Sequence, residues 1–291
     1  MAEIGSTVPR RQLGRYLKQA REQAGISLEA AAAELEWSRA KMYRIEGGQN
    51  VVRTHDVIAM CNVYGVSPEQ TQVLVALAKE SKTRGWWHAY GEVIPGWFEL
   101  YIGMEAAASR LRHYEPTVVP GLLQTREYAA AVTRATTDVS DSQVEQAVAL
   151  RMERQKVLSR RRPRPPKLEV ILDEMVLRRP ILDAEAWRDQ LQHLITMIES
   201  GVSLRIIPSH RWPHRVSMAG PFVILDFPSM GARPAEPTTV YSEGLTGALY
   251  LDRPKEIRPY AEAWDAMGEL ALSDAESQEL VAAIMKEHID A

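Results

Sequence analysis

A short segment near the N-terminus constrains the fold of this chain more than any other feature. Ser27 precedes a helical pattern, and serine is a preferred cap for a helix N-terminus. After a turn at Glu36, Ser38 is placed to cap another helix, which runs to Glu46 and is closed by two glycines. Two short helices joined by a tight turn can place the second helix in the major groove of DNA. The segment therefore predicts a helix-turn-helix over residues 28–46.

Further helical patterns surround this pair. One precedes it and stops at Gly25, another begins at Thr54, and Ser67-Pro68 opens the last, with proline at the first helical position. The sequence thus predicts an all-α domain of five helices over residues 1–82.

The helix that begins at Ser38 is expected to have two different faces. At 100° per residue, Met42 and Ile45 fall on one side, where they would pack in a core. The opposite side is expected to contact base edges: Arg39, Ala40, Tyr43 and Arg44. Arginine bonds guanine O6 and N7 bidentately, and the methyl group of alanine can contact thymine.

Contacts with DNA phosphates are expected at helix N-termini and at nearby polar or basic side chains. The candidates are Ser27, Ser38, Lys41, Asn50, Arg53, Arg10, Arg11 and Arg15. Residues 10–60 hold nine Lys and Arg against six Asp and Glu, a net of +3 within a chain of net charge -3. The alternative interpretation is a helical bundle whose arginines only form a solvated face.

The stretch SRAKMYRIEGG, within residues 13–67, resembles the Xre family of phage-repressor-like helix-turn-helix domains. In relatives, the positions matching Arg39, Ala40 and Arg44 face the bases. Glu36 departs from the pattern, because the family commonly has glycine there. A left-handed residue without glycine costs roughly 1–2 kcal/mol, so the turn either bears this cost or adopts another conformation. An alanine run also replaces the polar residues that relatives have early in the second helix.

Beyond residue 82 the composition changes, with tryptophans and prolines close together, so a second domain is expected over 83–291. Its patterns mix helices and strands, which predicts an α+β domain with a mixed sheet. The expected strands are 168–172, 203–207, 221–227 and 238–242. The expected helices are 96–108, 121–135, 142–160, 184–200, 259–271 and 275–288.

No catalytic centre can be read in this larger domain. Its histidines are scattered, and His210 and His214 lie in a proline-containing loop rather than in a helical metal-binding pair. Because no nucleophile elbow, phosphate loop or dinucleotide motif is present, we expect neither enzymatic activity nor a cofactor nor a metal. Cys61 is expected to be a small buried hydrophobic residue.

Two charged groups invite either a functional or a structural interpretation. A ligand or partner pocket is expected from Asp173, Glu174, Arg178, Tyr241 and Glu243, unless the first three only form surface ion pairs at a strand end. The basic run 151–167, with Arg160, Arg161, Arg162 and Arg164 beside three prolines, is either a second DNA-backbone contact or a solvated linker.

The motifs PGLLQT and LDEMVLRR, followed by GPFVILDF and TTVYSEG, look like a domain of unknown function attached to many actinobacterial helix-turn-helix regulators. The resemblance covers residues 83–288. It implies a transcriptional regulator of an antitoxin-like type, since relatives are often paired with a small partner protein, and it implies no catalytic activity.

The expected function is therefore sequence-specific regulation of transcription by a homodimer that binds double-stranded DNA at a palindromic operator. The larger domain would mediate dimerisation and sense a ligand or a partner protein. The alternative is an antitoxin-like protein that sequesters a small partner and autoregulates its own operon. An enzyme fused to a DNA-binding module is the third and least favoured hypothesis, because no set of nucleophile, base and orienting group can be named. A single cysteine, no signal-peptide pattern and no long apolar stretch predict a cytoplasmic protein without membrane contact.

Overall fold

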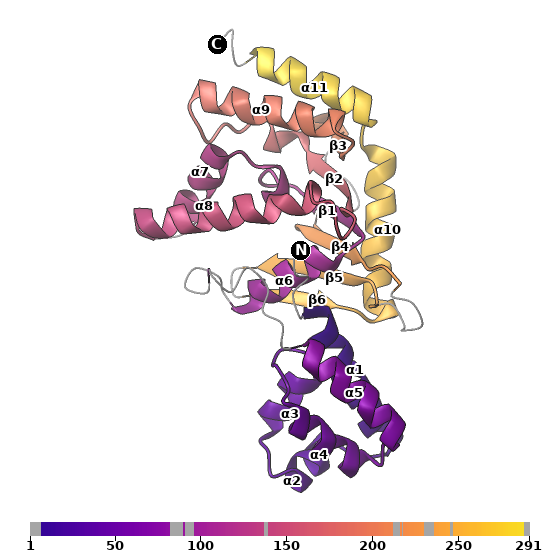
Figure 1. Cartoon of the computed structure of the whole chain (residues 1–291). Coiled ribbons are helices and arrows are strands. Elements are labelled where there is room, and N and C mark those ends of the chain that lie inside the picture. The colour runs from indigo at the N-terminus through magenta and orange to yellow at the C-terminus, as the bar shows by residue number, and fades with distance from the viewer. Residues whose placement is uncertain are drawn as a thin grey trace. The chain divides into compact units, whose positions relative to one another are not determined.

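The computed structural model describes residues 7–81, 90, 96–136, 139–211, 216, 218–229, 236–244 and 247–287 (Figure 1). The chain forms two compact units. Unit 1 comprises Met1–Ala89 and Glu99–Ala107, and unit 2 comprises Tyr90–Phe98 and Ala108–Ala291. The expected domain boundary after residue 82 stays a prediction, because residues 82–89 lie outside the described part.

Unit 1 is helical, which confirms the expected all-α domain. Its first five helices are α1 (Thr7–Gln23), α2 (Leu28–Glu34), α3 (Arg39–Glu46), α4 (Thr54–Tyr64) and α5 (Pro68–Glu80). A sixth helix, α6 (Gly96–Ala107), contributes its residues from Glu99 onward to this unit.

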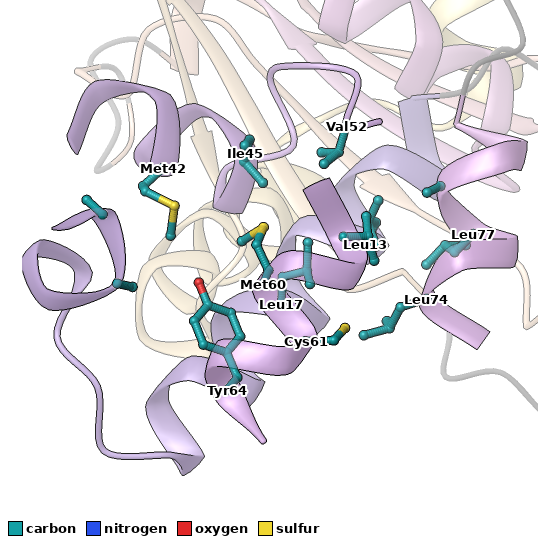
Figure 2. Close-up of a cluster of buried hydrophobic side chains, with 14 residues drawn as sticks. Leu13, Leu17, Met42, Ile45, Val52, Met60, Cys61, Tyr64, Leu74 and Leu77 are labelled. Atoms are coloured by element: carbon teal, nitrogen blue, oxygen red, sulfur yellow. The ribbon is translucent and has the colours of Figure 1, made fainter. Parts of the chain in front are cut away.

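The core of unit 1 is built from the apolar stripes of these helices. Figure 2 shows Leu13 and Leu17 of α1 together with Met42 of α3 and Met60 of α4, all fully buried. Cys61 is buried in the same cluster, as expected. Burial of such side chains stabilises a fold by about 1.5–3 kcal/mol each. The packing therefore fixes which side of α3 faces inward.

Two glycines let α1 lie directly against the end of α3. A Cβ atom at Gly14 would lie 2.6 Å from the backbone oxygen of Ile45 and 2.7 Å from that of Glu46. Gly48 has a φ of +67°, and a Cβ atom there would lie 2.7 Å from Cα of Arg11. Any larger residue at either position would push α3 away from α1.

Unit 2 contains a six-stranded sheet in the order β3-β2-β1-β4-β5-β6 within the described residues. The strands are β1 (Arg110–Glu115), β2 (Lys167–Asp173), β3 (Ser203–Ile207), β4 (Phe222–Asp226), β5 (Thr239–Gly244) and β6 (Gly247–Leu251). β1, β2 and β3 run parallel, whereas β4, β5 and β6 are joined antiparallel. The expected α+β domain with a mixed sheet is therefore confirmed.

β1 and β6 were not among the expected strands. β1 has the polar sequence RLRHYE, but its charges find partners on neighbouring strands: Arg110 bonds Glu169, and Arg112 lies 3.1 Å from Asp226. The neutralising partners are distant in sequence, so a local pattern could not reveal this strand.

Helices cover both faces of the sheet (Figure 1). They are α7 (Arg126–Thr136), α8 (Asp141–Gln155), α9 (Ala184–Glu199), α10 (Pro254–Leu270) and α11 (Asp274–Glu287), with short 3-10 turns η2 (Gly121–Leu123), η3 (Lys156–Leu158), η4 (Glu174–Val176) and η5 (Ser209–Arg211). α10 packs Trp264 and Met267 against Phe222 and Ile224. On the other side, the ring of Tyr128 in α7 stacks on Trp187 of α9 at 5.8 Å.

α10 begins earlier than expected. The sequence predicts this helix over residues 259–271. The helix instead starts at Pro254, which occupies the first turn, and Pro259 lies inside it. Pro254 suits the first helical position. Pro259 has no N–H to donate within the helix, and α10 nevertheless continues through it to Leu270.

Candidate nucleic-acid interface

The two serines cap their helices as the sequence indicates. Ser27 Oγ accepts a hydrogen bond from the backbone N of Ala30 at 3.0 Å, and Ser38 Oγ accepts one from that of Lys41 at 3.1 Å. Each hydroxyl satisfies one of the N–H groups that a helix start leaves without an intrahelical partner. The two caps fix where α2 and α3 begin.

The turn between α2 and α3 depends on Glu36. Its φ is 55°, and the backbone N of Trp37 reaches back to the oxygen of Ala32 at 2.8 Å. The left-handed turn is therefore kept without glycine, and the chain bears the cost that a side chain incurs in this conformation.

α3 has one buried and one exposed side. Met42 and Ile45 are 0% and 2% exposed. The opposite side consists of exposed residues: Arg39, Ala40, Tyr43 and Arg44. Tyr43 is 65% exposed, which is unusual for a large aromatic side chain. The helix thus presents two guanidinium groups, a phenol and a methyl group on one surface.

Neighbouring side chains hold both basic groups at the start of α3. Arg39 Nε lies 3.0 Å from Glu29 Oε1 of α2, in a pair whose members are both exposed. Lys41 Nζ lies 3.4 Å from the centre of the Trp37 ring and 3.8 Å from Asp56 Oδ1. The two cations are therefore directed to different sides of α3.

A buried ion pair anchors the far end of α3, and sequence reasoning missed it. Arg21 of α1 donates from Nε and Nη2 to the two carboxylate oxygens of Glu46, at 2.7 and 2.8 Å. Its Nη1 donates to the backbone oxygen of Ile26 at 2.8 Å. The hydrogen bond with Glu46 raises the pKa of Arg21 above its usual value. The only available signal was the position of Glu46 next to Ile45 on the buried side of the helix.

The expected phosphate-contacting residues differ in their exposure. Ser27, Ser38, Asn50 and Arg53 are exposed, while Lys41 and Arg15 are partly exposed.

Arg10 and Arg11 are more buried than residues that contact DNA phosphates should be. Arg10 is partly buried, and burial lowers its pKa, against the opposing effect of Glu99. Arg11 is 6% exposed, and its Nη1 lies 3.2 Å from Sδ of Met104 in α6. Because α6 is distant in sequence, the pattern around Arg11 could not show this burial. Arg11 therefore does not present its charge to solvent.

Comparison with known families gives two matches, one for each part of the chain. Residues 98–283 match the family described as a domain of unknown function (DUF5753), which spans more than half of the 291 residues. The chain belongs to the DUF5753 family. Residues 12–74 match the family described as a helix-turn-helix domain. No curated protein and no solved structure matches the chain.

The helix-turn-helix match, together with the exposed side of α3, indicates that this DUF5753 protein is a DNA-binding regulator. The helix-turn-helix match points to a regulator rather than to an enzyme. The DUF5753 region itself carries no assigned activity.

Within the DUF5753 region, the residues of the expected pocket fall into two separate groups. Asp173 ends β2, whereas Tyr241 and Glu243 lie on β5, and two strands stand between β2 and β5. At about 4.8 Å per strand, the groups are on the order of 14 Å apart. One pocket lined by both groups would have to span this distance, and the shared site stays a prediction.

The first group has a structural role. Asp173 Oδ1 accepts from the backbone N of Met175 and caps η4. Glu174 accepts from the backbone N of Ser209 at 2.7 Å and also pairs with Arg178, which reaches Glu287 of α11 at 2.7 Å. These bonds tie the end of β2 to the segment after β3 and to α11. In the second group, Tyr241 donates to Glu243 at 2.8 Å.

Arg151, the first residue of the basic run 151–167, makes a specific internal contact. Its Nη1 donates to Oε1 of Gln124, in the motif PGLLQT, at 2.6 Å. Burial, then the nearby charge of Arg154, lowers the pKa of Arg151 to about 10. The Nε2 of Gln124 donates to the backbone oxygen of Val119 at 2.6 Å, so the orientation of the amide is fixed. PGLLQT therefore ties α8 to the segment that follows β1.

Among the described residues, no three His, Cys, Asp or Glu side chains are grouped so as to hold a metal ion. His210 lies in η5, and His214 is outside the described residues. Within the described part of the chain, no helix has the length and apolar character needed to span a membrane.

Proposed function

We propose that this protein is a sequence-specific transcriptional regulator that reads DNA with α3. The observation that carries the proposal is the exposed side of α3, where Arg39, Ala40, Tyr43 and Arg44 stand together while Met42 and Ile45 anchor the helix from behind. A helix of this kind enters the major groove with its N-terminal residues against the base edges.

Each residue of the interface has a separate role. Arg39 and Arg44 bond guanine, Ala40 contacts a thymine methyl group, and Tyr43 covers a neighbouring base edge. A second set positions the domain on the phosphates: Ser27, Ser38, Lys41, Asn50, Arg53, Arg15 and, from its partly buried position, Arg10. Arg11 is left out of this set because it is buried.

The pair formed by Arg39 and Glu29 supports a reading role for Arg39. Exposed ion pairs contribute only about 0–1 kcal/mol, so a guanine can displace Glu29 without a large cost. Contact of Arg39 with a phosphate is less favourable, because the carboxylate of Glu29 repels the phosphate. Glu29 thus favours contact with a base over contact with the backbone.

Two variants test these roles. Arg39→Ala is expected to lose about 1–3 kcal/mol of preference at one base position, whereas Lys41→Ala weakens binding to all sequences alike. Gel-shift titrations on the operator and on single-base variants measure both effects. An equal loss for both variants on every sequence would overturn the assignment of roles.

The proposal includes a homodimer in the cytoplasm, with unit 2 as the dimerisation and sensing domain. A two-fold dimer places two α3 helices about 34 Å apart, in successive major grooves, which requires a palindromic operator. Sedimentation analysis and footprinting test this arrangement. A monomer that protects a single half-site as tightly as the full operator would contradict it.

The resemblance of SRAKMYRIEGG supports the finer assignment to Xre-like regulators, and that of the PGLLQT and LDEMVLRR motifs supports the actinobacterial antitoxin-like type. It also supports the alternative that the chain sequesters a small partner protein and autoregulates its own operon. A stoichiometric small partner in a pull-down from native cells would favour this alternative. Binding of the protein to a palindrome in the promoter of its own operon, and to no other promoter, would agree with it.

A further inference from the structure

A concentrated basic segment of unit 2 has no role in the fold described above. Between η3 and β2, residues 160–166 form a loop with the sequence RRRPRPP, which we name the arginine loop. From Arg154 to Leu168 the chain has seven Lys and Arg and no Asp or Glu, although its overall net charge is -3.

The arginines at the centre of this loop are directed to solvent without acidic partners. Arg161, Arg162 and Arg164 are exposed, and no carboxylate among the described residues lies within ion-pair distance of them. The flanking lysines differ, because Lys156 pairs with Glu153 and Lys167 with Glu169. The charge of the loop is thus compensated at its edges and left uncompensated at its centre.

The loop also has a defined backbone. Arg160 Nη2 donates to the backbone oxygen of Arg164 at 3.2 Å, and the three prolines each fix their own φ angle. The backbone N of Lys167 donates to the oxygen of Ser109 at 2.9 Å, where the sheet begins. Less conformational entropy is therefore lost when the arginines bind a partner.

A solvated surface usually intersperses both signs of charge, because like charges repel each other. α10 follows this rule, since its exposed Arg258 faces Glu262 at 3.7 Å. The arginine loop does not follow it. A polyanion is the partner that would relieve the repulsion, and guanidinium groups match the geometry of phosphate better than ammonium groups do.

We propose that the arginine loop binds the phosphate backbone of DNA that flanks the operator bound by α3. The inference rests on the proposed function, because α3 and the loop belong to one chain, and DNA bound by α3 is therefore tethered to the loop. Contacts to phosphate add affinity without adding sequence preference. The loop therefore extends the footprint of the regulator beyond the bases that α3 reads.

The test compares two triple variants of the full-length chain. In the first, Arg161, Arg162 and Arg164 are replaced by alanine. The control replaces Arg188, Lys255 and Arg258, three exposed cations of α9 and α10, and so removes the same charge from unit 2. Binding to an operator with long flanks and to the minimal operator is measured over a series of salt concentrations. Thermal unfolding verifies that both variants are folded.

Each phosphate contact contributes about 0.9 to the slope of log K against log salt. The loop variant is expected to reduce this slope by about 2 to 3 on the long duplex and to leave it unchanged on the minimal one. The control is expected to match the unmodified chain on both. Equal slopes for the loop variant and the control on the long duplex overturn the proposal.

Two further results separate this proposal from the underlying one. If the unmodified chain binds long duplexes without sequence preference and the loop variant loses this binding, the loop proposal stands and the reading role of α3 fails. If the loop variant binds DNA normally but loses affinity for RNA or for an acidic protein, the loop proposal fails and the α3 assignment is unaffected.

Discussion

At the scale of single residues, the pairing of Arg21 with Glu46 decides how α3 is held. Both side chains are almost fully buried, and their two hydrogen bonds join α1 to the last residue of α3. The nearby phenol of Tyr64 responds to the same environment, because burial and then the charge of Glu46 raise its pKa. A buried charge without a partner is far less stable than a buried pair.

Removing one member of this pair is therefore expected to cost much more than removing both. Arg21→Met should lower the free energy of unfolding by about 3–5 kcal/mol, because Glu46 is left buried without a partner. The double variant Arg21→Met with Glu46→Leu should recover most of that loss. Urea unfolding measures both. A double variant as unstable as the single one would show that the pair itself, rather than the orphaned carboxylate, supplies the stability.

At the scale of elements, the turn between α2 and α3 bears a local cost that a substitution can relieve. Glu36 has a φ of 55°, a conformation that glycine adopts without strain. Glu36→Gly is expected to stabilise the domain by up to about 1 kcal/mol, net of the greater entropy of glycine in the unfolded chain. Thermal unfolding measures the change.

The matched control for this turn is Glu34→Gly, at the end of α2, where the backbone is helical. Glycine in a helix costs about 1 kcal/mol, so this variant should be destabilised. If both variants lose stability equally, the left-handed conformation of Glu36 bears no measurable cost.

The carboxylate of Glu174 also acts at this scale, because it joins η4 to the segment after β3 and, through Arg178, to α11. Burial raises the pKa of Glu174, but hydrogen bonds from the Ser209 backbone N–H and from Arg178 outweigh this, and the net pKa is lowered from 4.5. A carboxylate with a lowered pKa stabilises the fold above its unfolded pKa, and that contribution is lost as pH falls through the folded pKa.

Unfolding by urea at a series of pH values tests this linkage. The stability of the unmodified protein is expected to fall as pH drops below about 4.5, whereas Glu174→Gln should be less stable at pH 7 and should lose less on acidification. Glu185→Gln, at an exposed position of α9, serves as the control and should follow the unmodified protein. Parallel pH curves for all three proteins would assign the acid sensitivity to other carboxylates.

At the scale of the whole molecule, the units do not follow simple sequence segments. Residues Glu99–Ala107 of α6 belong to unit 1, where Met104 contacts Arg11. Gly103 permits a close approach to α1, since a Cβ atom there would lie 1.9 Å from Oγ1 of Thr7. Unit 1 is therefore completed by a segment that follows the expected boundary.

A fragment of residues 1–107 is accordingly expected to be more stable than a fragment of residues 1–82, by about 1–3 kcal/mol. The shorter fragment would expose the buried side chains of Thr7 and Arg11. Circular dichroism during thermal unfolding compares the two fragments. Identical midpoints would show that α6 contributes nothing to unit 1 and would favour a boundary at residue 82.

Features that depend on neighbours along the chain could be predicted from the amino-acid sequence. Serine caps, glycine stops and apolar spacing predict the five helices and the exposed side of α3, and apolar runs predict β2, β3, β4 and β5. These signals are local, because capping and helical periodicity act within a few residues.

Tertiary packing set the features that depend on residues far apart in sequence. It formed β1 from a charged segment, buried Arg11 against α6, paired Arg21 with Glu46, and separated Tyr241 and Glu243 from Asp173. The physical reason is common to all of these. The free energy of a charged side chain depends on the partners and the burial that folding supplies, and neither is encoded next to it in the chain.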